Sequence, residues 1–133
     1  MRYEASFLIL SLALLVSPSS AHAHHSFAAE YDTDKPVQIT GTVTKVEWTN
    51  PHVHFYVDVK NNQGEVVNWN IELGPPLILR HLGWRQDSLK TGDQVTVEGY
   101  LAKDQSNLAN AKKVTLADGR SIFVGSSAEK RGE

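Results

Sequence analysis

Hydrophobic and polar residues alternate along several short stretches of this chain, a pattern typical of strands with one buried face. The first predicted strand starts at Val37 and runs toward Trp48, and its alternation slips by one residue after Val43. Such a slip indicates a β-bulge, and Gly41 allows the strand to bend. Further strands are predicted over Val53–Val59, Val67–Leu73, Val95–Gly99, Ala109–Leu116 and Ile122–Val124.

A short helix is predicted between the third and fourth strands, over Leu77–Leu82. Ile78 and Leu82 are four residues apart, so we expect one helical face to bury both. Three strands, a helix and then two or three strands is the layout of the OB-fold. The pattern therefore predicts an all-β protein: a small closed OB-like β-barrel of five to six strands. A different small barrel or sandwich is the alternative.

The start of the chain has the pattern of an export signal. The apolar run Phe7–Val16 is too short to span a bilayer, and Ala21-His22-Ala23 fits the A-x-A motif of signal peptidase. Cleavage after Ala23 divides the chain into a signal peptide (1–23), an N-terminal arm (24–36), the barrel domain (37–124) and a polar tail predicted to be disordered (125–133). We expect a periplasmic or secreted protein without a stable membrane anchor; cleavage after Ala21 and an uncleaved anchor are the alternatives.

Composition removes several classes of function. The 133 residues include no cysteine, so disulfides and thiolate metal sites are impossible. The formal net charge is −2, with both signs mixed along the chain. Because binding to phosphate backbones or anionic lipid needs a basic face, we expect neither nucleic acid nor a membrane surface as a partner.

Several segments resemble a known family. HHSFAAEYD (His24–Asp32), WTNPHVHFYVDV (within Gly41–Val59) and VTVEGYLAKD (within Ser88–Arg120) are similar to a group of small exported bacterial proteins classed as a domain of unknown function. The resemblance covers most of the chain after the signal peptide. It implies an exported, barrel-like domain and no established activity.

Four of the six histidines form two pairs, His24–His25 and His52–His54. Residues i and i+2 of a strand point to the same side, ~7 Å apart along the chain, so His52 and His54 present two imidazoles on one face. After cleavage at Ala23, the α-amine and imidazole of His24 can chelate an ion together. Imidazole suits copper, nickel and zinc, so the sequence predicts a divalent metal ion held by His24, His25, His52 and His54. The other interpretation is a polar linker followed by ordinary solvated histidines.

Aromatic residues offer a second function. Trp48, Asn50 and Tyr56 flank the loop between the first two strands, where OB-folds commonly bind oligomers. A carbohydrate, peptide or partner-protein module using the loop from Trp48 to His54 is therefore the alternative prediction, with Trp48 as a core residue the simpler interpretation. No nucleophile elbow or phosphate cradle is present, so we expect no catalysis.

Overall fold

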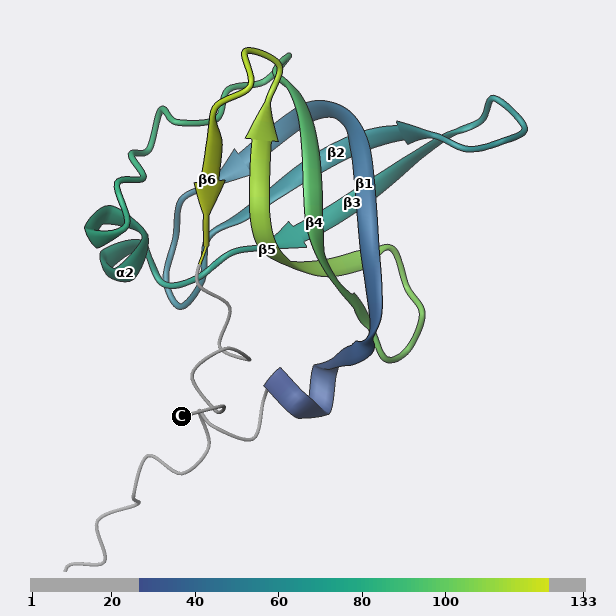
Figure 1. The fold of residues 1–133 in the computed structure, drawn as a ribbon, viewed down its shortest axis with the longest axis horizontal. Coiled ribbons are helices and arrows are strands. Elements are labelled where there is room, and N and C mark those ends of the chain that lie inside the picture. Colours follow the sequence, from purple (N-terminus) through teal and green to yellow (C-terminus); the bar gives the residue numbers. More distant parts are fainter. Residues whose placement is uncertain (1–26, 125–133) are drawn as a thin grey trace, which may run out of the picture.

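The computed structural model describes residues 27–124, which form one curved sheet of six strands (Figure 1). The strands are β1 (Tyr31–Glu47), β2 (His54–Lys60), β3 (Val66–Glu72), β4 (Gln94–Ala102), β5 (Leu108–Leu116) and β6 (Ser121–Phe123). The helix α2 (Pro76–His81) lies between β3 and β4. No helix in this described part of the chain is long and apolar enough to cross a membrane.

Strand pairing closes the sheet into a barrel. The order is β3-β2-β1-β4-β5-β6, and β3 also pairs with β5 in parallel, from Asn70 opposite Leu108 to Glu72 opposite Asn110. The pairs β1–β2, β2–β3, β3–β5, β5–β4 and β4–β1 therefore form a complete ring. This confirms the predicted all-β, OB-like fold. The β2–β3 hairpin projects beyond the ring (Figure 1).

The long first strand serves two neighbours because it bends. Its pairing with β2 shifts register between Val43 and Lys45, which is where the sequence predicted a bulge. At Gly41, a Cβ atom would lie 2.2 Å from the Asp58 carbonyl oxygen, so only glycine lets β2 approach this closely. A second shift, between Glu98 and Gly99, leaves one extra residue, Lys112, in β5 and marks a bulge there.

The barrel interior is filled by alternate residues of the strands, as the pattern predicted. Val53, Phe55 and Val57 are fully buried in one row, and Val97 and Val114 face them from the other side of the ring. A smaller cluster lies at one end, where Phe27 and Tyr31 pack against Ala102, with Tyr100 and Leu108 beside them.

Two expectations differ from the structure. The helix buries Pro76 and Leu79, and Ile78 and Leu82 are exposed. The apolar residues of this segment are consecutive, so their spacing did not define a single face, and the short helix turns only one side inward. The first strand also starts earlier than predicted: Tyr31 pairs with Ala102 across an irregularity between Asp32 and Pro36.

Candidate metal site

His52 and His54 lie side by side on the outer face of the barrel. His54 is the first residue of β2, and His52 lies two residues before it. Val53, between the two histidines, and Phe55, directly after them, point into the core. Both histidines are half-buried. The strand alternation that buries the valine and phenylalanine therefore presents both imidazoles on one surface, as predicted.

Each imidazole is held by a hydrogen bond to a side chain of β3. His52 Nδ1 lies 2.7 Å from Glu72 Oε1, and His54 Nδ1 lies 2.8 Å from Asn70 Oδ1. Carboxylate and amide oxygens accept hydrogen bonds, so each ring carries a proton on Nδ1 and donates it. In the neutral form of each ring the lone pair is then on Nε2, the nitrogen left for an external ligand.

Glu72 is the buried centre of this network. Only 8% of its surface is exposed, and its second oxygen, Oε2, accepts a hydrogen bond from the Tyr31 hydroxyl. A buried carboxylate is costly unless its oxygens are satisfied, and these two donors satisfy both. Burial, and then the bond to Glu72, raise the pKa of Tyr31 well above its ordinary value.

The N-terminal segment is attached to the barrel beside this network. Residues 27–30 form a helical turn, and the Phe27 ring packs 5.2 Å from that of Tyr31. The Lys103 amide donates a hydrogen bond to the Glu30 carbonyl oxygen at 2.8 Å. These contacts bring the chain that follows His24 and His25 to the same end of the barrel as Glu72.

Glu30 lies near enough to His52, His54 and Glu72 to interact with their charges. Although Glu30 is exposed overall, partial desolvation raises the pKa of its carboxyl group, and the Glu72 charge raises it further. His54 and His52 act in the opposite direction on the same pKa, and Asp104 adds to the increase. This surface therefore combines imidazoles with several carboxylates, a composition that attracts cations.

The described residues do not complete a metal centre alone. Within residues 27–124, no group of three or more histidine, cysteine, aspartate or glutamate side chains is arranged to hold an ion. The predicted ligands His24 and His25 lie outside the described residues. Of the four predicted ligands, the structure describes His52 and His54.

The residues of the alternative site do not share one environment. Trp48 is half-buried against the core, and its Nε1 atom is covered and has no hydrogen-bond partner. Asn50 is exposed. The Tyr56 hydroxyl donates to Glu47 Oε2 at 3.3 Å, and Lys45 Nζ lies 5.4 Å from the Tyr56 ring centre. This arrangement favours a packing role for Trp48.

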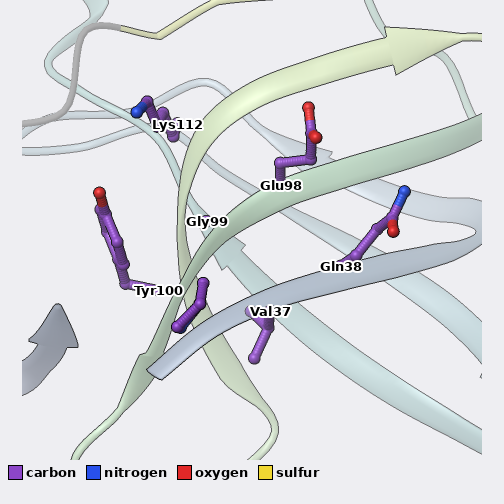
Figure 2. Close-up of a pocket in the computed structure, with 7 residues that line it drawn as sticks. Val37, Gln38, Glu98, Gly99, Tyr100 and Lys112 are labelled. Carbon is purple, nitrogen blue, oxygen red and sulfur yellow. The ribbon is translucent and has the colours of Figure 1, made fainter. Parts of the chain in front are cut away.

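A shallow hollow of about 310 Å³ lies elsewhere on the barrel surface, over β1, β4 and β5 (Figure 2). Gln38, Glu98, Tyr100 and Lys112 line it, and neither His52 nor His54 does. It is separate from the histidine surface.

Glu72, Asn70 and Tyr31 are the residues that the sequence did not identify as part of the site. Glu72 and Asn70 belong to the outward face of the third predicted strand, so the alternation could have placed them near the histidines once the pairing with β2 was known. Tyr31 gave no such signal, because it was assigned to the N-terminal arm.

The strand pairing first defines the class of fold. The ring of pairings and the helix between β3 and β4 make this an OB-like barrel. The crystal structure of the mitochondrial single-stranded DNA binding protein Rim1 from S. cerevisiae is similar, with 15% identity and a TM-score of 0.49. The match covers 62% of this chain and 93% of Rim1.

The chain belongs to the family of unknown function DUF6152, whose model matches residues 12–111. This confirms the resemblance found in the sequence. A search of curated proteins finds no match.

The expectation that nucleic acid is excluded as a partner is wrong as stated. The similar structure is that of a protein described as binding single-stranded DNA. The mixed charge of the chain was too weak a ground for the exclusion. The likeness itself assigns no ligand to this chain.

Proposed function

We propose that this domain is an exported binding protein for a divalent transition metal ion, Cu(II), Ni(II) or Zn(II), held through Nε2 of His52 and His54. The observation that carries the proposal is the pair of hydrogen bonds from Nδ1 to Glu72 and Asn70. Metal-binding histidines commonly donate their other ring proton to a carboxylate or carbonyl oxygen, which fixes the tautomer and orients the ligating nitrogen. Two adjacent histidines with this arrangement favour metal binding over two freely solvated side chains.

The remaining ligands of the proposal come from the N-terminus. Phe27 is anchored on the barrel, and His25 and His24 precede it by two and three residues. An extended chain covers at most about 3.6 Å per residue, so a segment of three residues can span ~11 Å at most. Cleavage after Ala23 would add the α-amine of His24, and cleavage after Ala21 would make His24 the third residue and add backbone amide nitrogens.

Export is part of the proposal. The apolar run Phe7–Val16 followed by Ala21-His22-Ala23 supports a cleaved signal peptide and a periplasmic or secreted protein. A metal ion binds the neutral form of imidazole. Binding through histidine therefore needs a pH near or above the histidine pKa. The absence of catalysis remains a prediction from the sequence.

Isothermal titration of the protein secreted by its own signal tests the proposal. Mass spectrometry first fixes the terminal residue, and the protein is then titrated with Cu(II), Ni(II) and Zn(II). We expect one ion per chain for at least one metal, with affinity lowered about tenfold or more in His52→Ala and in His54→Ala.

The matched control is His81→Ala, because His81 is an exposed residue of α2. This variant should bind as the wild type does. Equal binding by the wild type, His52→Ala and His54→Ala would overturn the proposal. A His24→Ala/His25→Ala variant that binds like the wild type would remove the N-terminal histidines from the site.

A further inference from the structure

Tyr31 and His52 use the two oxygens of one carboxylate. His52 Nδ1 is bonded to Glu72 Oε1, and the Tyr31 hydroxyl donates to Oε2. Glu72 belongs to β3, Tyr31 opens β1, and His52 precedes β2, so a single side chain joins three parts of the barrel.

A carboxylate fixed at both oxygens has a fixed plane. Because Glu72 is 8% exposed and Tyr31 is 2% exposed, solvent does not supply alternative partners. Without the Tyr31 hydroxyl, the Glu72 carboxylate could rotate about its side-chain torsions, and the hydrogen bond that orients His52 would lose its fixed direction. Tyr31 therefore restrains the His52 ring without touching it.

Tyr31 is in turn held by the N-terminal segment. Its ring packs against the ring of Phe27, which also meets the Tyr100 ring edge-on at 6.4 Å. The carbonyl oxygen of Glu30, the residue before Tyr31, accepts a hydrogen bond from the Lys103 amide. The position of the tyrosine hydroxyl thus depends on residues 27–30 remaining on the barrel.

We propose that Tyr31 is a positioning residue for the ligand His52, acting through Glu72, so that metal binding and attachment of residues 27–31 to the barrel stabilise each other. This rests on the proposed metal-binding function. Coupling between two sites is reciprocal: what the attached segment adds to metal affinity, the metal adds to attachment of the segment.

The first test compares Zn(II) affinity in Tyr31→Phe and Tyr56→Phe. Both changes remove one hydroxyl and keep the ring, but the Tyr56 hydroxyl bonds to Glu47 and not to Glu72. We expect Tyr31→Phe to weaken Zn(II) binding about tenfold and Tyr56→Phe to leave it unchanged. Equal affinity in Tyr31→Phe and wild type would overturn the proposal.

The second test is made on the wild-type protein and reads the segment directly. The Lys103 amide reports attachment, because it donates to the Glu30 carbonyl oxygen. Saturating Zn(II) should slow hydrogen exchange at this amide several-fold in the wild type and not in Tyr31→Phe. If Tyr31 served only to fill space in the barrel, the exchange rate of the Lys103 amide would not depend on the metal.

The two proposals fail differently. If the wild type binds no Zn(II), Ni(II) or Cu(II), the proposed function is wrong. If the wild type binds one of these ions but that ion leaves exchange at Lys103 unchanged, metal binding stands and the role of Tyr31 is wrong.

Discussion

Tyr31 and Glu72 lie 41 residues apart in the sequence, and the hydroxyl of one donates a hydrogen bond to the carboxylate of the other inside the barrel. Both side chains are almost completely buried, and the same carboxylate accepts a second bond from His52. The contact therefore joins the end of the barrel core to its histidine surface.

Stability at alkaline pH should reveal the Tyr31 contact. Burial and the bond to Glu72 raise the pKa of Tyr31 above its ordinary 10.0. The native protein then keeps the phenol proton at a pH where the unfolded chain loses it, so the contribution of Tyr31 is complete below pH 10 and declines as the pH rises toward the native pKa. Between pH 9 and 11, the wild type should lose about 1.4 kcal/mol more unfolding free energy than Tyr31→Phe.

Urea denaturation of both proteins at the two pH values measures this difference. Other tyrosines and lysines titrate in both proteins and cancel in the comparison. Equal losses would show that the Tyr31 phenol ionises as readily in the native state as in the unfolded chain.

The close approach of β2 to β1 at Gly41 should not tolerate a side chain at this position. In Gly41→Ala, the new Cβ would lie 2.2 Å from the Asp58 carbonyl oxygen and 2.8 Å from a Val57 methyl carbon. We expect a loss of about 1–3 kcal/mol or more in unfolding free energy. Gly74→Ala is the control, because its nearest atom would be an ordinary 3.9 Å away, and the expected change is within about 0.5 kcal/mol. Similar losses in both variants would mean that close approach at Gly41 is not what the strand requires.

The inward face of α2 can be tested by a pair of leucine variants. Leu79 is fully buried, and Leu77 is 61% exposed. Leu79→Ala should cost about 2–5 kcal/mol, since it removes buried methyl groups and leaves a cavity. Leu77→Ala should change the unfolding free energy by less than about 0.5 kcal/mol. Thermal or urea denaturation gives both values, and a larger loss in Leu77→Ala would mean that the helix packs through its other side.

The barrel strands were predictable because one side of each is buried. Alternation located the buried row of Val53, Phe55 and Val57, and the phase slip after Val43 located the bulge. The helix was less predictable, since Leu77, Ile78 and Leu79 are consecutive and a helix of six residues spans fewer than two turns. Only packing against the barrel decides that Leu79 points inward.

The histidine pair was visible in the sequence, but its supports were not. Spacing alone placed His52 and His54 on one face. The partners Asn70 and Glu72 come from another strand and depend on register, with His54 opposite Glu72. Tyr31 reaches the same carboxylate only because β1 begins before Val37, across an irregularity that obscured its alternation.

The central claim is that the Nε2 atoms of His52 and His54 are available for a metal ion, and two-bond ¹H–¹⁵N NMR of the histidine rings tests it most directly. In the metal-free protein both rings should show the Nδ1-protonated tautomer. One equivalent of Zn(II) should then shift the Nε2 resonances of both His52 and His54 and leave that of His81 in place. His81 is the control, and its resonance should neither shift in Zn(II) nor broaden in Cu(II). If the His52 and His54 resonances also neither shift in excess Zn(II) nor broaden in Cu(II), then these histidines are not metal ligands.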